Sequence, residues 1–311
     1  MNILLWHVHG SWTTAFVQGE HRYFVPVIQD RGPDGRGRAQ TWEWPQSVIE
    51  LPPERLAHQQ IDVLIVQRPH ELTDLAPRWL AREPGRDVPT IYVEHDAPQG
   101  EVLDMVHCAA NRPELIVVHV THFNDLFWNM GSTPTRVIEH GVVDPGYRYT
   151  GEMNRSAIVI NEPSRRGRVT GSDLIDRFAQ VAPVDLFGIS AAICGGIENL
   201  PQAQLHSEMA KRRLYIHPIR WTSLGLSLIE AMHLGMPVIA LATTEVPKAV
   251  PSEAGFISTD ISELLEYTRM LITHPKQARS MGQAAREAAL ARYGLPQFLR
   301  NWNALLAEVA A

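Results

Sequence analysis

Residues 214–250 carry the side chains whose types and spacing best suit the binding of a nucleotide. A strand ends at His217, a short loop follows, and Ser223 and Gly225 open a helix that carries Glu230. Backbone amides at a helix N-terminus hold phosphates, and a glycine there lets a ligand approach the backbone closely. A carboxylate about one and a half turns further along can accept hydrogen bonds from both hydroxyls of a ribose. An ordinary strand and helix, with Glu230 as a paired structural residue, is the alternative.

Basic side chains near the start of the second half suit the same chemistry. Arg165, Arg166 and Arg168 follow the apolar run 157–160 by a few positions. Guanidinium groups form paired hydrogen bonds with phosphate oxygens, so these three residues are candidates for binding a diphosphate. A solvated basic loop is the alternative interpretation.

Two short motifs in the first half place polar side chains directly after apolar strands. His95 follows residues 90–94, whereas His9, Gly10 and Trp12 follow the first strand. The carboxyl ends of parallel strands border the crevice where α/β proteins bind ligands. His95 is therefore a candidate catalytic residue, and His9 and Gly10 are candidates for contact with a ligand. Trp12 either stacks on a sugar or covers the core.

A pair of tryptophans in the first half allows two interpretations. Trp42 and Trp44 are separated by a single residue. They form either an aromatic platform for an acceptor or one face of a strand.

Motifs for other ligands are missing or weak. No Gly-x-Gly-x-x-Gly follows either first strand and no Walker A loop occurs, which argues against a dinucleotide cofactor and a P-loop. His119 and His122 near Asp125 suggest a metal site, but Thr121 is better explained as the cap of a helix over 121–130. We therefore expect neither a bound metal nor a cofactor.

Short apolar runs rich in β-branched residues alternate with amphipathic segments, and this rhythm occurs twice. It predicts an α/β protein of two doubly wound domains, each with a parallel sheet covered on both faces. A stretch rich in glycine and proline at 140–155 marks the boundary, so we expect domains over 1–150 and 151–294 and a last helix over 295–311. The predicted strands are 3–8, 61–67, 90–94, 115–120, 157–160, 185–187, 214–217 and 237–241, and the predicted late helices are 261–273, 275–293 and 295–310.

Composition and charge narrow the class of protein. Of 311 residues, 45% are hydrophobic and 20% charged, which is typical of a globular protein. Residues 1–150 hold 12 Arg and no Lys against 19 acidic residues, a charge of −7, which argues against nucleic acid and against peripheral association with an anionic membrane. No apolar run reaches the roughly 18 residues of a transmembrane segment. Two distant cysteines, Cys108 and Cys194, favour a reducing, cytoplasmic location.

The segment 214–250 resembles the donor-site signature of the retaining, metal-independent glycosyltransferases of GT-B fold, a class that includes sucrose, glycogen and phosphatidylinositol mannosyl enzymes. Their pattern is Pro-Ser-x-x-Glu-x-Phe-Gly-Leu-x-x-x-Glu-Ala-Met-Ala-x-Gly-x-Pro-Val. Thr222 replaces the first glutamate of the family's Glu-x7-Glu pair. The residues that fall in register are Pro218, Gly225, Leu226, Glu230, Ala231, Met232, Gly235, Pro237 and Val238.

This resemblance implies two Rossmann-like domains facing across a cleft, with the acceptor domain first, the nucleotide-sugar domain second and the last helix returning to the first domain. It implies that Glu230 binds the ribose of a UDP- or GDP-type sugar donor, and that Ser223, Gly225 and Leu226 line the donor site. His95 corresponds to a histidine near the transferred sugar. His9, Gly10 and Trp12 lie at the position of the family's glycine loop over donor phosphate and acceptor. The implied reaction moves the sugar, without a metal and with retention of configuration, to a hydroxyl of a small-molecule, glycan or natural-product acceptor.

Three alternatives stay open. Thr222 allows a catalytically degenerate GT-B protein that binds a nucleotide or a partner without turnover. A sugar-nucleotide epimerase shares the two-domain shape but needs carboxylates and a histidine deep in the cleft. A flavodoxin-like redox protein also has a doubly wound sheet, and a colourless purified protein would exclude it.

Overall fold

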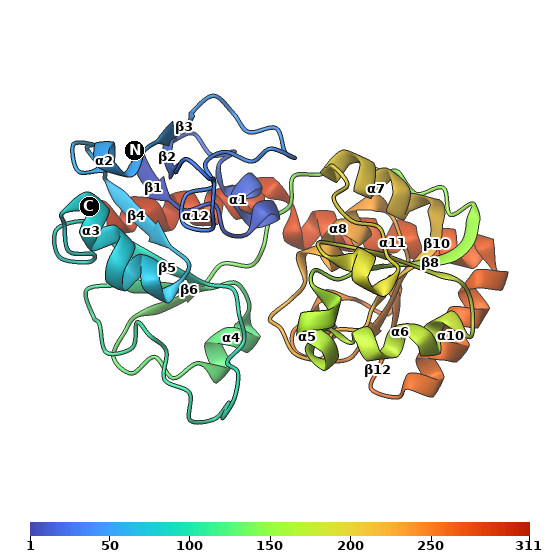
Figure 1. Ribbon diagram of the computed structural model, residues 1–311. Helices are drawn as coiled ribbons and strands as arrows, with labels where there is room; N and C mark the ends of the chain where they lie inside the picture. Colours follow the sequence, from blue (N-terminus) through green and yellow to red (C-terminus); the bar gives the residue numbers. More distant parts are fainter. The chain divides into compact units, whose positions relative to one another are not determined.

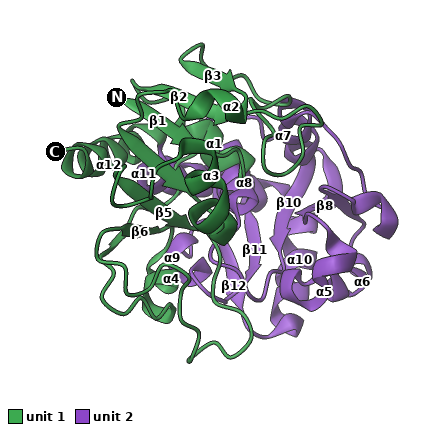
Figure 2. Ribbon diagram, turned by 60° about the vertical axis from the view of Figure 1, so that its left-hand side comes forward, with its two compact units in different colours: residues 1–143, 295–311 green, residues 144–294 purple.

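The computed structural model describes residues 1–311, which divide into two compact units. Unit 1 consists of residues 1–143 and 295–311, and unit 2 of residues 144–294. Figure 2 shows unit 1 in green and unit 2 in purple. The first and last segments of the chain therefore belong to the same unit.

The division precedes residue 144 instead of following residue 150. Backbone amides of residues 148–151 donate to the carbonyl oxygens of Leu234 and Ala210, both in unit 2. The glycine-rich stretch that marks the boundary in the sequence is thus partly bound to the second unit.

Unit 1 is built on a seven-stranded parallel sheet of order β3-β2-β1-β4-β5-β6-β7 (Figure 1). The order reverses between β1 and β4, where Leu5 pairs with Ile65, so the loops after these two strands leave the same edge side by side. The strands are β1 (Asn2–Leu5), β2 (Arg22–Pro26), β3 (Val48–Leu51), β4 (Val63–Val66), β5 (Thr90–Glu94), β6 (Ile116–His119) and β7 (Thr135–Val137).

The helices of unit 1 include the C-terminal one. Buried residues of α12 recur every three or four positions, and among them Trp302 packs edge-on against Trp12 and Phe16 of α1 with ring centroids 5.7 and 5.0 Å apart. The last helix therefore completes the core of unit 1. The helices are α1 (Gly10–Phe16), α2 (Pro53–Leu56), a π-helical turn (Glu71–Leu75), α3 (Ala76–Leu80), α4 (His122–Phe127) and α12 (Leu295–Val309).

Unit 2 is built on a five-stranded parallel sheet of order β12-β11-β10-β8-β9 (Figure 1). Here the order reverses between β8 and β10. Its strands are β8 (Met153–Val159), β9 (Val184–Phe187), β10 (Arg212–His217), β11 (Val238–Leu241) and β12 (Gly255–Ser258).

Helices of different character cover the sheet of unit 2. Every residue of α8 from Leu228 to Leu234 is buried, as expected of a helix that is apolar almost all round. None of the helices in the chain is long and apolar enough to cross a membrane. The helical segments are α5 (Pro163–Thr170), α6 (Ile175–Ala179), α7 (Gln202–Lys211), α8 (Leu226–Leu234), α9 (Val246–Ala249), α10 (Ile261–Thr273), α11 (Pro275–Tyr293) and the 3-10 turns Ser172–Leu174 and Ala191–Cys194.

The predicted fold class, two doubly wound α/β domains, is confirmed. The strand over 90–94 and the helices over 261–273 and 275–293 have the predicted bounds. Four strands were not predicted from the sequence, namely β2, β3, β7 and β12. Of these, β7 lies at the edge of its sheet and has no buried residue, so an apolar run does not mark it.

Candidate functional site

The carboxyl ends of β8 and β10 form the point at which the strand order of unit 2 reverses, where doubly wound proteins bind ligands. Residues 160–162 connect β8 to α5, and residues 218–225 connect β10 to α8. The backbone N–H of Arg220 donates to the carbonyl of Val169 at 2.9 Å and joins the second loop to α5. The basic segment and the start of α8 therefore lie at one edge of one sheet.

Gly225 caps α8 in an extended conformation and lies against the side chain of His217. A Cβ added at Gly225 would be 2.7 Å from Cε1 of His217, so only glycine fits without a shift. Burial lowers the pKa of His217 to about 3, and the imidazole is therefore neutral. The first backbone amides of α8, those of Leu226 and Ser227, have no acceptor within the helix and suit an anion.

Thr222 and Ser223 precede this helix start. Thr222 is half-buried and Ser223 is buried. Hydroxyls at both positions supply hydrogen bonds without negative charge, so the structure offers no carboxylate at position 222.

Glu230 is buried on α8 and is held by two residues of α7. Its Oε2 accepts a hydrogen bond from Nε2 of Gln202 at 3.0 Å, and Nε2 of His206 lies 3.3 Å from the same oxygen. The amide of Gln202 also lies 2.8 Å from His206 Nε2. The sequence predicted Glu230 but not these two partners. They precede it by 28 and 24 residues and meet it only because α7 packs on α8.

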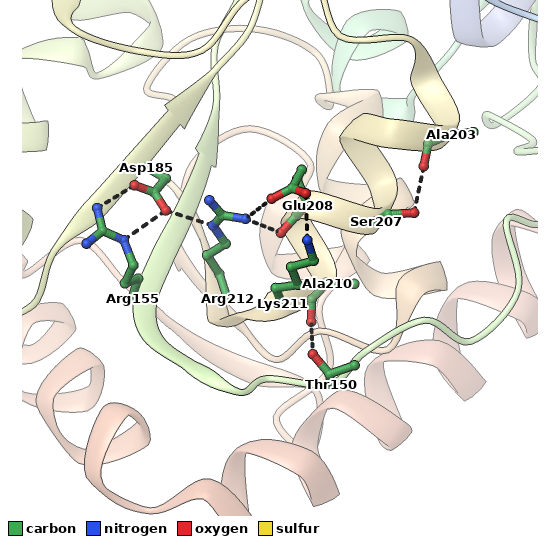
Figure 3. Close-up of polar contacts among 9 residues, drawn as sticks. All are labelled: Thr150, Arg155, Asp185, Ala203, Ser207, Glu208, Ala210, Lys211 and Arg212. Atoms are coloured by element: carbon green, nitrogen blue, oxygen red, sulfur yellow. Dashed lines mark hydrogen bonds and ion pairs between the residues drawn. The ribbon is translucent and has the colours of Figure 1, made fainter.

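A network of ion pairs fixes α7 to the sheet (Figure 3). Asp185 of β9 accepts hydrogen bonds from Arg155 of β8 at 2.9 and 2.5 Å and from Arg212 at 2.7 Å. Arg212 also donates to Glu208 of α7 at 2.7 Å, and Lys211 pairs with the same carboxylate at 2.7 Å. The helix that carries Gln202 and His206 is thereby anchored at its other end.

The three predicted arginines of α5 differ in their surroundings. Arg165 forms an ion pair with Glu162 at 2.5 Å, and Arg168 one with Asp173 at 3.2 Å; their side chains are 69% and 78% exposed. Arg166 is half-buried, and its guanidinium has no carboxylate partner. Arg166 is therefore the cation of this group that is most available to a diphosphate.

In unit 1, three histidines stack at the carboxyl edge of the sheet. The ring centroids of His9 and His95 are 3.9 Å apart, and those of His95 and His140 are 6.1 Å apart. Nε2 of His95 lies 3.0 Å from Oε1 of Gln67, and the Gln67 amide donates to Trp6 O at 2.8 Å. Because Oε1 is only an acceptor, His95 carries its proton on Nε2 and leaves Nδ1 as an acceptor.

Burial keeps His95 and His140 neutral. Desolvation, with lesser contributions from His9 and His140, holds the pKa of His95 well below its usual range. Desolvation and then His9 lower the pKa of His140 to about 3. His95 and His140 are therefore neutral hydrogen-bonding groups near pH 7. The sequence predicted His9 and His95, whereas Gln67 has no motif beyond its place directly after β4.

Gly10 and Trp12, both in α1, have different surroundings. Trp12 is fully buried, stacks on Phe16 with centroids 4.9 Å apart and meets His95 at its edge. This burial supports the interpretation of Trp12 as a core residue and not as one that stacks on a sugar. Gly10 opens α1, and a Cβ there would lie 3.5 Å from the indole nitrogen of Trp42.

The residues considered for a metal site lie at or near the start of α4. Thr121 caps α4 by accepting the N–H of Asn124 at 3.1 Å, as predicted. His119 is fully buried and lies 3.8 Å from Asp125, whereas His122 is exposed. No group of three ligating side chains is gathered anywhere in the chain.

The whole chain has the fold of solved glycosyltransferase structures. Sucrose-phosphate synthase from Thermosynechococcus elongatus is 14% identical with a TM-score of 0.72, and 99% of each chain is covered. HepE from Anabaena in complex with UDP-glucose is 15% identical with a TM-score of 0.69, and 99% of this chain and 100% of HepE are covered. TarM from S. aureus, solved with UDP, is 14% identical with a TM-score of 0.64, over 78% of this chain and 55% of TarM.

The architecture is therefore GT-B, with two Rossmann-like domains. Within it, residues 195–288 match the family of glycosyl transferases group 1. The matched range contains Glu230, its two α7 partners and the start of α8. The expected GT-B fold is confirmed, and residues 195–288 have the expected similarity to group 1 glycosyl transferases. No curated protein sequence is significantly similar to the chain.

Proposed function

We propose that the protein transfers a sugar from a nucleoside-diphosphate sugar to an acceptor hydroxyl, and that unit 2 binds the donor. The observation that carries this proposal is Glu230, which is buried on α8 beside Gln202 and His206 in the range that matches group 1 glycosyl transferases. A carboxylate that accepts a hydrogen bond from a fixed amide is held in place for the hydroxyls of a ribose. His206 also provides a polar side chain beside the ribose.

We propose a UDP-type donor and a reaction without a metal. UDP is present in the TarM structure, and UDP-glucose in a HepE structure. Charge develops on the diphosphate as it leaves, and the amides at the start of α8 and the guanidinium of Arg166 can stabilise that charge. The backbone dipoles and the cation at this point stabilise the charge that a bound divalent ion stabilises in metal-dependent enzymes.

The reaction proposed on the family resemblance retains the configuration of the sugar. The acceptor oxygen attacks the anomeric carbon on the face from which the diphosphate leaves; the bond to the phosphate oxygen breaks, and that oxygen takes the acceptor proton. His95 is proposed to contact the transferred sugar. Because its imidazole is neutral, it acts through a hydrogen bond and not through charge.

The cytoplasm is the proposed location. Cys108 and Cys194 are both exposed free thiols, which suits a reducing compartment.

One observation favours a second candidate, a nucleotide-binding protein without turnover. Thr222 stands where the resembled enzymes have the glutamate that touches the transferred sugar. A neutral hydroxyl makes weaker hydrogen bonds than a carboxylate, so the donor sugar is held less firmly.

Thermal unfolding and turnover together test both proposals. UDP at 100 times its dissociation constant should stabilise the protein by about 2.7 kcal/mol, and GDP and dTDP by less. Release of UDP from UDP-glucose, measured with a panel of hydroxyl acceptors in the presence of EDTA, then separates an enzyme from a binder. Binding of UDP with no transfer to any acceptor would support the second candidate, and no binding of any nucleoside diphosphate would refute both.

A further inference from the structure

The switch point of unit 1 carries a charged cluster that the proposed transfer chemistry does not use. Arg68 follows β4 by two residues, next to the loop that leaves β1. Its Nε donates to Glu71 at 2.6 Å and its Nη1 lies 3.2 Å from Asp34. Nη2 of Arg68 is buried and has no hydrogen-bond partner. The guanidinium is thus fixed in orientation, with one donor unsatisfied, at the edge where α/β sheets bind ligands.

The long connection between β2 and β3, residues 27–47, crosses this edge. His70 pairs with Asp34 of the connection at 2.8 Å, and Nδ1 of His7 donates to the carbonyl of Gly37 at 3.1 Å. Arg38 closes the base of the connection through the carbonyls of Trp44, Pro45 and Val48 at 2.6, 3.0 and 2.5 Å. These contacts hold Asp34 beside Arg68 although the connection has little regular structure.

The two tryptophans of this connection differ in burial. Trp44 is buried and donates its indole N–H to Thr14 at 2.8 Å, so it is part of the core. Trp42 is only half-buried, and its indole nitrogen lies beside Gly10, at the loop after β1. Gly10 has no side chain to cover that indole. An aromatic surface and a fixed charged cluster therefore stand on adjacent strand ends.

We propose that Asp34, Trp42 and Arg68 bind the acceptor, and that the acceptor is a carbohydrate. A sugar ring has an apolar face that packs on an indole and hydroxyls that both donate and accept hydrogen bonds. Asp34 is the acceptor and Arg68 the donor for such hydroxyls, and their side chains are 41% and 19% exposed. This inference rests on the proposed transferase function, because it gives the class of its second substrate.

The charge of the cluster argues against an anionic acceptor. Arg68 stands between two carboxylates, Asp34 and Glu71, so the cluster has no excess positive charge for a phosphate or carboxylate group. An apolar acceptor would instead fit the exposed side chains of Leu103 and Leu126, which are 83% and 79% exposed, on different elements of unit 1. That apolar class is the competing outcome of the test.

Saturation-transfer NMR on the full-length chain tests the inference directly. The probes are the methyl glycosides of glucose, galactose, mannose and N-acetylglucosamine, with octanol as the apolar comparison. We expect at least one glycoside to receive saturation on its ring protons. Trp42→Ala should abolish the signal, Trp42→Phe should keep part of it, and Arg68→Gln and Asp34→Asn should each weaken affinity about tenfold.

An ion pair between α3 and the π-helical turn before it provides the control. Arg78 and Asp74 are paired at 3.0 Å and are 60% and 57% exposed, so Arg78→Gln removes a similar pair away from the switch point and should leave glycoside binding unchanged. Equal binding by the wild type, W42F and R68Q, or binding of octanol alone, would overturn the inference. UDP affinity measured on the same samples separates the two ideas: UDP binding without glycoside binding refutes only this inference, and glycoside binding without UDP binding refutes only the proposed donor.

Discussion

Nε2 of Gln202 donates to Oε2 of Glu230 across the packed helices α7 and α8, at 3.0 Å. The carboxylate is thus held in orientation by an amide on the neighbouring helix. His206 contacts the same oxygen at 3.3 Å. A ribose bound through Glu230 would therefore meet a carboxylate whose rotation is already restricted, which reduces the entropy lost on binding.

The first prediction concerns Glu230. Replacing it with Gln keeps the shape but removes the charge, and should cost on the order of 1.5–3 kcal/mol of UDP binding, as for a hydrogen bond to a charged group. Gln202→Ala should cost less, because it frees the carboxylate without removing it. Calorimetry with UDP measures both, with circular dichroism as the check on folding. Unchanged affinity in a folded Glu230→Gln protein would refute the ribose assignment.

The second prediction ranks the arginines of α5. Arg166 lacks a carboxylate partner, whereas Arg165 is paired with Glu162. Arg166→Gln should therefore weaken UDP about tenfold while leaving uridine unchanged, since one charge-assisted hydrogen bond to phosphate contributes roughly 1.5–3 kcal/mol. Arg165→Gln is the matched control and should have a smaller effect. Equal losses for UDP and uridine would show that the segment is only solvated surface.

The third prediction is that turnover needs no divalent ion. The start of α8 and Arg166 supply the positive potential at the proposed diphosphate site. Initial rates with UDP-glucose should therefore be the same in EDTA as in Mg²⁺ or Mn²⁺. A rate abolished by EDTA, restored by metal and not traceable to product release would contradict the mechanism.

The fourth prediction concerns Thr222. Thr222→Glu restores the charged acceptor of the resembled enzymes and should raise both donor affinity and single-turnover transfer from UDP-glucose. Discrimination among donor sugars should also increase. If Ser223 already replaces the missing carboxylate, the larger side chain will crowd the site and lower both values. A wild type that is already strictly selective and loses activity on gaining the glutamate would show that the proposed effect of Thr222 is wrong.

The fifth prediction is a loss of stability in acid that depends on His140. Its pKa is about 3 in the folded protein against the ordinary 6.5, so between these values only the unfolded chain binds the proton. The contribution is complete above pH 6.5 and is lost as the pH falls toward 3, by at most about 1.4 kcal/mol per pH unit. His140→Asn should therefore flatten the decline in the free energy of unfolding below pH 6.5.

Urea titrations followed by tryptophan fluorescence between pH 7 and about pH 4.5 measure that slope. His58→Asn, at an exposed histidine, serves as the control. A slope in His140→Asn equal to that of the wild type would exclude the buried imidazole as its source.

The sequence by itself determined the fold class and the order of the principal elements. Apolar runs such as residues 90–94 favour strands buried on both faces, and the three-and-four spacing of residues 261–273 favours a helix with one buried side. The spacing from Gly225 to Glu230 likewise placed a helix start and a carboxylate on one element. These are local properties, which short stretches of chain express through their own periodicity.

Only the tertiary structure decided which side chains meet. Gln202 reaches Glu230, and Asp34 reaches Arg68, through the packing of elements far apart in the sequence, and neither pair has a sequence spacing that would reveal it. The same holds for Trp42 and Trp44, which the sequence treats alike but which packing separates into a half-exposed and a buried side chain. Such contacts depend on strand order, and strand order is set by the burial of whole sheets instead of by any one segment.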